Sequence, residues 1–192
     1  MHNNYWRTEK INIRAFDESD IERMIQNRNN RDSKLEWLHD VIRLPRAPEK
    51  LRADHAEAIA EANSDDKCLL AIEDLNGNYA GELNVWLTKR PELYFVYGIY
   101  IEDRFRGRGF AKEALTILLD YYFNEKGFRK AEAHVYGYND GSRVFHEKFG
   151  FVLEGTLRGR IFSRGVANSI HIYGLLAQEF NERHSHNDWR RV

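Results

Sequence analysis

The sequence predicts an α+β fold, in which one mixed α/β sheet carries helices on both faces. The hydrophobic pattern changes its period along the chain, from strand-like alternation to helical stripes and back. The predicted elements follow the order β-α-α-α-β-β-β-α-β-α-β-β, which combines hairpins with strands separated by helices. No repeat or Pro/Ser-rich linker divides the 192 residues. We therefore expect a single domain over 1–192, with its core at 11–180 and a flexible tail at 181–192.

One strand and three helices are expected at the start of the chain. Apolar Ile11 and Ile13 alternate with polar residues, as in a strand that is buried on one face. A helix start is expected over 17–20, because the apolar residues that follow have helical spacing. Two more helical stretches are expected near 34–43 and over 48–62, where a proline suits the first turn.

A three-stranded meander is expected next. The apolar runs 68–72 and 81–86 flank Asn76-Gly77. Asn-Gly between two such runs is a strong hairpin signal, because both residues tolerate positive φ. The run 94–101 is the third strand of the meander.

The second half of the chain alternates helices with strands. A helix over 109–124 has one apolar stripe, and Gly127 is a suitable stop. A strand over 131–136 and a short helix over 141–149 follow, before two closing strands near 152–161 and 166–176.

Composition excludes several classes of protein. No apolar run approaches the roughly 18–20 residues that cross a bilayer, and the N-terminal residues lack the apolar stretch of a secretory signal. A formal net charge of −1 gives no global attraction for nucleic acid or anionic lipid. One cysteine cannot form an internal disulfide, which suits a reducing compartment. We therefore expect a cytoplasmic protein that binds neither nucleic acid nor membrane.

One loop carries the strongest functional signal: Arg104-Phe105-Arg106-Gly107-Arg108-Gly109-Phe110-Ala111, between a predicted strand and a predicted helix. The two glycines permit a sharp turn and a close approach of the backbone to a ligand. A helix N-terminus offers unpaired N–H groups, and three arginines add positive charge. The loop therefore predicts a cradle for phosphates, with a solvated Arg-rich turn or a nucleic-acid contact as alternatives.

Two nucleotide-binding motifs do not fit this loop. A dinucleotide fingerprint needs a third glycine where Lys112 stands, and the Gly-Lys-Ser/Thr of a Walker A loop is missing from it.

The segment Arg106-Gly107-Arg108-Gly109-Phe110-Ala111 matches Q/R-x-x-G-x-G/A, the pyrophosphate-binding motif of the GNAT N-acetyltransferase superfamily. Downstream, 139–151 resembles the N-x-x-S stretch and closing G-F of its RimJ/RimL branch, which acetylates N-termini of ribosomal proteins. The segments 154–158 and 173–176 resemble that branch's closing strands. The resemblance implies the GNAT fold, a mostly antiparallel twisted sheet of about seven strands with one splayed parallel pair.

The resemblance also implies that acetyl-CoA lies where strands 97–101 and 131–138 part. Backbone groups of 99–101 are expected to bond the pantetheine arm, and N–H groups of 106–111 to hold the pyrophosphate. No metal is expected, because the acetyl group passes directly to the amine. The residues expected to bind the cofactor are Ile99, Tyr100, Ile101, Arg106, Gly107, Arg108, Gly109, Phe110, Ala111, Asn139, Ser142, Arg143 and Phe145.

Attack of an amine on a thioester needs a base for the amine, a donor to the oxyanion and a proton for the thiolate. Ser142 matches the serine of the motif and is the first candidate for the thiolate; alternatively, it is a cap or first-turn residue of the short helix. His146 stands seven residues after the motif asparagine, where many members carry a tyrosine acid. It is a candidate acid, or a half-exposed histidine without a role.

The general base has no direct match in this sequence. Many members of the branch carry a glutamate two residues before the strand's glycine, and this chain has Val96 there. Glu82, in the preceding strand, could act through a water molecule or could simply face solvent.

The resemblance predicts an acetyl-CoA-dependent N-acetyltransferase, an acyltransferase that acts on a primary amine. A weak base suits an α-amine, whose pKa of about 7.7–8.0 lies well below the value of about 10.4 for lysine. We therefore expect a protein N-terminus as the acceptor, with a polyamine, amino acid or antibiotic amine as alternatives. A non-catalytic module that senses acyl-CoA is the competing function, and a homodimer is expected by analogy with the branch.

Overall fold

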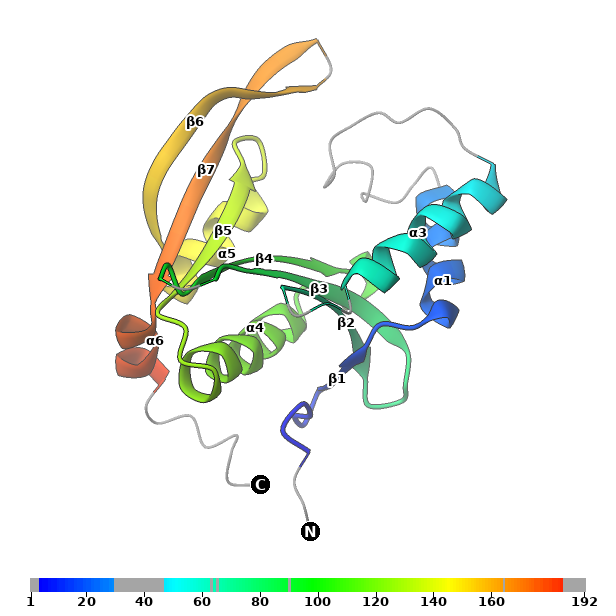
Figure 1. Ribbon diagram of the computed structural model, residues 1–192, viewed down its shortest axis with the longest axis horizontal. Helices are drawn as coiled ribbons and strands as arrows, with labels where there is room; N and C mark the ends of the chain where they lie inside the picture. The colour runs from blue at the N-terminus through cyan, green and yellow to red at the C-terminus, as the bar shows by residue number, and fades with distance from the viewer. Residues whose placement is uncertain are drawn as a thin grey trace.

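The computed structural model describes residues 4–29, 47–62, 64, 66–89, 91–163 and 165–184. A seven-stranded sheet runs through these residues in the order β1-β2-β3-β4-β5-β7-β6 (Figure 1), which confirms the predicted mixed sheet. The strands are β1 (Ile11–Ala15), β2 (Lys67–Asp74), β3 (Tyr79–Leu87), β4 (Tyr94–Ile101), β5 (Lys130–Tyr136), β6 (Val152–Ser163) and β7 (Val166–Leu176).

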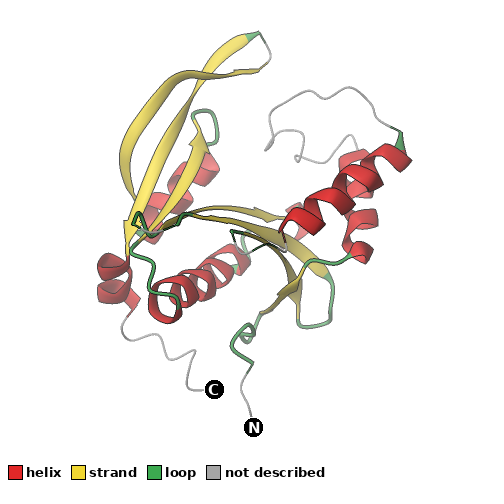
Figure 2. Cartoon of the chain, viewed as in Figure 1, coloured by secondary structure: helices red, strands yellow, loops and turns green. Residues whose placement is uncertain are grey.

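Helices pack against this sheet from two sides (Figure 2). The helices are α1 (Glu18–Asn29), α3 (Pro48–Ala62), α4 (Phe110–Asp120), α5 (Asp140–Phe149) and α6 (Ala177–His184). The helix expected near 34–43 lies outside the described residues.

Alternation along β2 shows how the sheet separates two apolar layers. Successive strand residues point to opposite faces. Ile72 belongs to the main core, which also contains Leu115 of α4. Its neighbour Ala71 belongs to a smaller cluster with Ile21 of α1, against which Ile59 of α3 packs. The two faces of the sheet are therefore covered by different helices, as predicted.

The meander β2-β3-β4 forms as the Asn-Gly signal predicts. Both strand pairs are antiparallel, with Leu70 opposite Leu83 and Leu83 opposite Ile99. Gly77 has φ +77°, a conformation that L side chains rarely adopt. Asp74 supports the turn by accepting hydrogen bonds from the N–H groups of Asn76 and Asn78.

Helix α4 connects β4 to β5, which lie parallel. The helix ends earlier than expected, at Asp120, and a π-helical turn continues over Tyr121–Glu125. This wider turn places Tyr122 and Phe123 against Phe95, with ring centroids 4.7 and 5.7 Å apart. The change of helix type thus coincides with aromatic packing against β4.

Helix α6 corrects the expectation of a flexible tail from 181, because the helix continues to His184. Phe180 is buried, and its ring stacks on His184 with centroids 4.6 Å apart. A single apolar anchor thus orders a segment whose composition is otherwise polar. Residues 185–192 lie outside the described part.

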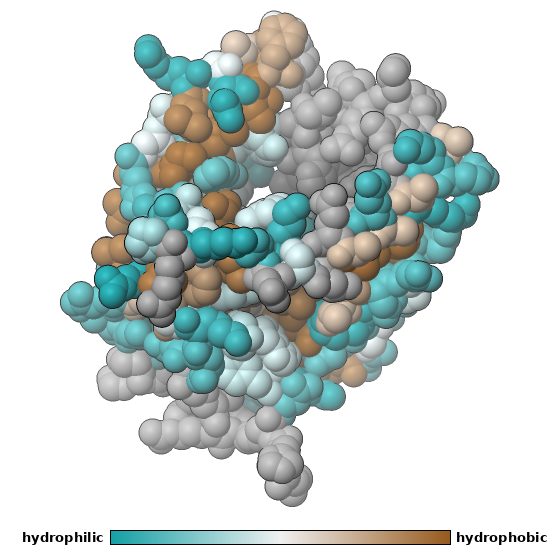
Figure 3. Space-filling view, in the orientation of Figure 1, coloured by the Kyte–Doolittle hydropathy of each residue, from teal (hydrophilic) through white to brown (hydrophobic). Residues whose placement is uncertain are grey.

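The hairpin of β6 and β7 extends away from the core and exposes apolar side chains (brown, upper left in Figure 3). Leu157, Phe162 and Val166 are among its exposed residues. Two register shifts interrupt the pairing of β6 with β7. Such irregularities in an edge strand disfavour pairing with another chain.

Candidate active site

Strands β4 and β5 part in the middle of the sheet. Their parallel pairing runs from Tyr94 opposite Lys130 to Tyr97 opposite Ala133. Beyond that rung, β4 continues along β3 to Ile101, and β5 continues along β7 to Tyr136. Figure 1 shows the two strands diverging. The segment 99–101 therefore has an edge that no described strand covers, where the resemblance predicts the pantetheine arm.

The phosphate loop follows directly from this edge. A short 3₁₀ turn over Asp103–Phe105 leads to Gly107, with φ +76°, and to Gly109, with φ +88°. Gly109 is the N-cap of α4, and no side chain caps the helix there. The first-turn N–H groups and the helix dipole are thus directed toward the loop, and the ammonium of Lys10, paired with Glu113, lies close to Gly109. This is the local geometry of an anion-binding helix terminus.

The three arginines of the loop differ in their partners. Arg104 pairs with Glu102 at 2.8 Å. Arg106 pairs with Asp103 at 2.8 Å, donates through Nε to the Ile101 carbonyl, and donates its N–H to the Asp103 carbonyl.

Arg108 has no carboxylate partner among the residues described; its guanidinium lies 5.5 Å from the centre of the Phe105 ring. Among the three arginines, Arg108 is therefore the one with uncompensated charge for a phosphate. The N–H of Arg106 already donates to the Asp103 carbonyl, so it is not available for the predicted contact with the pyrophosphate. That prediction is therefore restricted to the N–H groups of 107–111.

Asn139 and Ser142 begin helix α5. The Asn139 side chain is the N-cap, since its Oδ1 accepts from the Ser142 N–H at 3.0 Å. This use of Oδ1 leaves the side-chain amide as the group that can donate to a ligand.

His146 is buried, not half-exposed, with 4 % of its surface accessible. Its Nδ1 lies 2.7 Å from the Ser142 carbonyl, which can only accept, so Nδ1 carries the hydrogen. Burial lowers the pKa of His146 to about 4, so the ring is neutral at neutral pH. Ser142 Oγ lies 3.3 Å from the same Nδ1. Because that nitrogen is a donor, the serine hydroxyl keeps its own hydrogen for another acceptor.

Arg143 and Phe145, also expected to bind the cofactor, occupy different environments. Arg143 is held along the helix by Asp140 and Glu147, at 3.3 and 3.2 Å. Phe145 is partly buried against the main core, with its ring 5.3 Å from that of His146. The charge of Arg143 is therefore largely compensated within α5.

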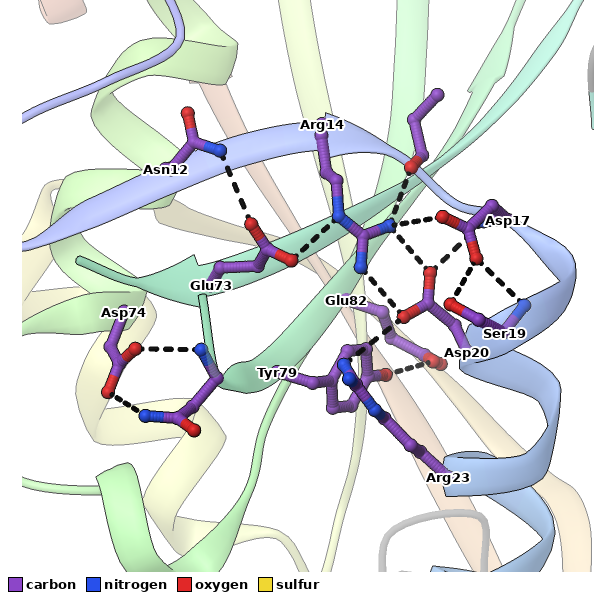
Figure 4. Close-up of polar contacts among 12 residues, drawn as sticks. Asn12, Arg14, Asp17, Ser19, Asp20, Arg23, Glu73, Asp74, Tyr79 and Glu82 are labelled. Atoms are coloured by element: carbon purple, nitrogen blue, oxygen red, sulfur yellow. Dashed lines mark hydrogen bonds and ion pairs between the residues drawn. The ribbon is translucent and has the colours of Figure 1, made fainter. Parts of the chain in front are cut away.

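Glu82 does not face solvent, since only 6 % of its surface is accessible. It stands opposite Tyr100 in β4, and Tyr79 Oη donates to its Oε2 at 3.0 Å (Figure 4). Its neighbour Leu83 belongs to the main core, so Glu82 points to the face that carries α1 and α3.

A polar cluster supports this face (Figure 4). Arg14 of β1 binds both oxygens of the fully buried Asp20 at 2.7 and 2.8 Å, and Glu73 of β2 at 2.7 Å. The cluster joins β1, β2 and the first turn of α1 next to Tyr79. Sequence reasoning missed it, because no spacing pattern relates residues 14, 20 and 73.

Tyr97 is one of several aromatic residues on the strands, and no motif in the sequence marks it as functional. It stands on the last paired rung of β4, with its hydroxyl buried and without a hydrogen-bond partner among the described residues. A buried hydroxyl cannot be recognised from composition or from strand alternation.

The described part of the chain lacks both a candidate metal site and a candidate membrane-spanning helix. It contains no group of three His, Cys, Asp or Glu side chains that could hold a metal ion. Within the same residues, no helix is both long and apolar enough to span a membrane.

A mixed sheet with parting parallel strands, followed by a glycine loop at a helix N-terminus, is the arrangement that the sequence resemblance implies for an acetyl-CoA-dependent acyltransferase. The Acetyltransferase (GNAT) domain matches residues 10–152. The chain therefore belongs to the GNAT acetyltransferase family.

Relatives of similar length support this assignment. The chain is 29 % identical over 180 residues to the "SPbeta prophage-derived uncharacterized N-acetyltransferase YokL" of Bacillus subtilis, covering 94 % of this chain and 97 % of that one. It is 26 % identical over 180 residues to the spermidine N(1)-acetyltransferase of Vibrio cholerae, covering 91 % and 97 %. A structure of spermidine N-acetyltransferase from Vibrio cholerae with CoA and spermine has the same fold. Its TM-score is 0.73 at 22 % identity, with 88 % and 97 % covered.

Proposed function

We propose that the protein transfers the acetyl group of acetyl-CoA to a primary amine of a small, positively charged acceptor of the polyamine type. The observation that carries this proposal is the buried carboxylate of Glu82, on a sheet face rich in carboxylates. The relation to a spermidine N(1)-acetyltransferase over almost the whole chain supports the same acceptor class.

The donor half of the site is proposed at the parting strands. The free edge of 99–101 suits the extended pantetheine arm, which bonds to backbone groups. The N–H groups of 107–111 and the guanidinium of Arg108 suit the pyrophosphate. Asn139 contributes its amide from the start of α5.

The acceptor half is proposed on the opposite side, around Glu82. Burial raises the pKa of the Tyr79 hydroxyl, and the charge of Glu82 raises it further. Asp20 and Glu102 act on the same hydroxyl in the same direction. These carboxylates contribute negative potential beneath this face of β3 and β4, which Arg14 and Arg104 offset in part. Such a potential attracts a polycationic amine and disfavours an anionic acceptor.

Two residues are proposed to move or hold the protons. Glu82 accepts a proton from the acceptor ammonium through a water molecule, which leaves a neutral nitrogen to attack the thioester carbon. The C–N bond forms, the C–S bond breaks, and the second proton lost by nitrogen ends on sulfur. Ser142 donates a hydrogen bond to that sulfur. His146 is neutral and holds Ser142 instead of acting as the acid.

A comparison of acceptors tests the proposed function. We expect thiol release from acetyl-CoA to show a kcat/KM for spermidine and spermine at least tenfold above that for a peptide with a free N-terminus. We also expect the KM for spermidine to rise with salt, because screening weakens attraction to the acidic face. A higher kcat/KM for the peptide, or no acceptor at all, would contradict the proposal.

A protein N-terminus is the second candidate acceptor. The observation that favours it is Val96, which leaves β4 without the carboxylate common in related enzymes. An α-amine needs less help from a base, because a larger fraction of it is neutral at pH 7. The same comparison, extended to an N-terminally blocked lysine peptide, distinguishes this candidate from lysine acetylation.

A further inference from the structure

Two buried polar atoms lie close to the point where β4 and β5 part. Tyr97 Oη and His146 Nε2 are both buried, and neither has a hydrogen-bond partner among the residues described. The exposed fractions of the two side chains are 3 % and 4 %. Burying such an atom without a partner costs about 1–3 kcal/mol, so a protein rarely leaves two of them in one cluster.

The two atoms belong to neighbouring rings. The Tyr97 and His146 centroids are 5.9 Å apart, with an interplanar angle of 41°. Phe151 contacts both rings, at 5.8 and 5.2 Å, and Tyr173 stacks on His146 at 6.0 Å. Aromatic side chains therefore enclose the pair.

The hydrogen-bonding requirements of the two atoms are complementary. Since Nδ1 of His146 donates to the Ser142 carbonyl, Nε2 is a pure acceptor. The Tyr97 phenol can donate and accept. A water molecule is the smallest group that can accept from the phenol and donate to the imidazole at once, and buried waters commonly bridge such atoms.

We propose that Tyr97 is a positioning residue, which holds His146 through one buried water molecule shared between Tyr97 Oη and His146 Nε2. The link runs from β4 through the water to His146, and from Nδ1 to the Ser142 carbonyl in the first turn of α5. It fixes the imidazole in the Nδ1–H tautomer. It also sets the position of the Ser142 hydroxyl relative to the strand edge, which matters for catalysis only if the proposed function holds.

The variant Tyr97→Phe removes the hydroxyl and keeps the ring. A matched control is Tyr122→Phe, which removes a buried hydroxyl whose partner is Cys68 Sγ. A crystal structure of the unaltered protein is expected to show one water molecule within about 2.7–3.2 Å of both atoms. In Tyr97→Phe that water should lose its place, while Tyr122→Phe should retain it. The unaltered protein without this water would overturn the proposal.

Histidine ¹⁵N NMR gives a readout that ordinary packing would not move. The His146 resonances can be assigned by their absence in His146→Gln. We expect the Nδ1–H tautomer in the unaltered protein, and in Tyr97→Phe a shift of Nε2 toward the value of an unbonded ring nitrogen. An unchanged Nε2 resonance in Tyr97→Phe would also overturn the proposal, whether or not the protein acetylates an amine.

Kinetics test the link to Ser142. Tyr97→Phe is expected to lower kcat about fivefold to tenfold, with the KM for acetyl-CoA unchanged within about twofold, because misplacing a donor affects the transition state. Tyr122→Phe should keep both constants. Equal kcat values for the two variants would remove the positioning role. A lack of acetylation by the unaltered protein would instead refute the proposed function. The crystallographic and NMR results would still decide whether the water molecule links Tyr97 to His146.

Discussion

In the first turn of α5, the backbone N–H and carbonyl of Ser142 each have a separate side-chain partner. Asn139 Oδ1 accepts a hydrogen bond from the Ser142 N–H, and His146 Nδ1 donates one to the Ser142 carbonyl. The hydroxyl of Ser142 is thereby the part of this residue that can still donate. Asn139 is therefore the cap of α5, and Ser142 lies in the first turn of this helix with a hydroxyl that can still donate. The role of that hydroxyl toward the thiolate stays a prediction.

The variant Ser142→Ala tests this donor. We expect kcat to fall about 10- to 100-fold, because the departing sulfur loses its hydrogen bond, while the KM for acetyl-CoA changes less than about threefold. Ser19→Ala, which removes an exposed hydroxyl bonded to Asp17, should leave both constants unchanged. A loss of acetyl-CoA binding in Ser142→Ala would assign the serine to the cofactor site alone.

The variant Glu82→Gln tests the proposed base. We expect kcat/KM for the amine to fall about 100-fold at pH 7, since a general base typically contributes about 10²–10⁴. The loss should shrink as pH approaches the pKa of the amine, where the acceptor is already neutral. Glu92→Gln, at an exposed turn, should behave like the unaltered protein. A loss that is constant with pH would indicate a binding role for Glu82.

Two glycines have similar positive φ values but different surroundings. Comparing substitutions at the two positions distinguishes an effect on ligand binding from an effect on stability. Gly109 begins α4 with φ +88°, and Gly77 turns the β2–β3 hairpin with φ +77°. A side chain at either position is strained by roughly 1–2 kcal/mol. Gly109 is proposed to lie against a phosphate, and Gly77 has open space around it.

The variants Gly109→Ala and Gly77→Ala should therefore differ in acetyl-CoA binding. Both should lower the free energy of unfolding by similar amounts. Gly109→Ala is expected to raise the Kd for acetyl-CoA about tenfold, as measured by calorimetry, while Gly77→Ala keeps it. Equal affinities in the two variants would refute the phosphate cradle.

Helix α5 also gives the protein a sensitivity to acid through His146. Its folded-state pKa of about 4 lies below the unfolded value of about 6.5, because burial disfavours the charged ring. Between these values the unfolded chain binds a proton that the folded protein does not. The contribution of His146 to the free energy of unfolding is therefore fully present above pH 6.5 and is lost as the pH falls toward 4.

We therefore expect the free energy of unfolding to fall between pH 6.5 and pH 4 by up to about 3 kcal/mol more than it does in His146→Gln. Urea titrations at several pH values measure this difference. The comparison with the variant removes the effect of the carboxylates that titrate in the same range. Parallel curves for the two proteins would show that His146 titrates normally.

At the scale of the whole molecule, hydrophobic period and turn chemistry predicted most of the fold. Strand alternation and Asn76-Gly77 correctly predicted the meander, because both depend on neighbouring residues. The family resemblance supplied the single parallel pair, which no local pattern could give. The π turn after Asp120 and the ordered helix α6 were not predicted, since both depend on aromatic packing between distant segments.

The candidate site was predictable where backbone conformation determines it. Gly107, Gly109 and Asn139 occupy the positions that their residue types require, namely positive φ and a helix cap. Burial and pairing were not predictable, because they depend on three-dimensional neighbours. The inward position of Glu82, the compensated charge of Arg143 and the orphaned hydroxyl of Tyr97 are examples.

The central claim is that the parting strands, the phosphate loop and the first turn of α5 form one site for acetyl transfer to an amine. The most direct measurement is mass spectrometry of spermidine after incubation with acetyl-CoA and the protein, with the released thiol determined in parallel. The account predicts spermidine acetylated on a primary nitrogen, with one thiol released for each acetyl group transferred. Thiol release without an acetylated amine, or bound acetyl-CoA that is never consumed, would contradict it.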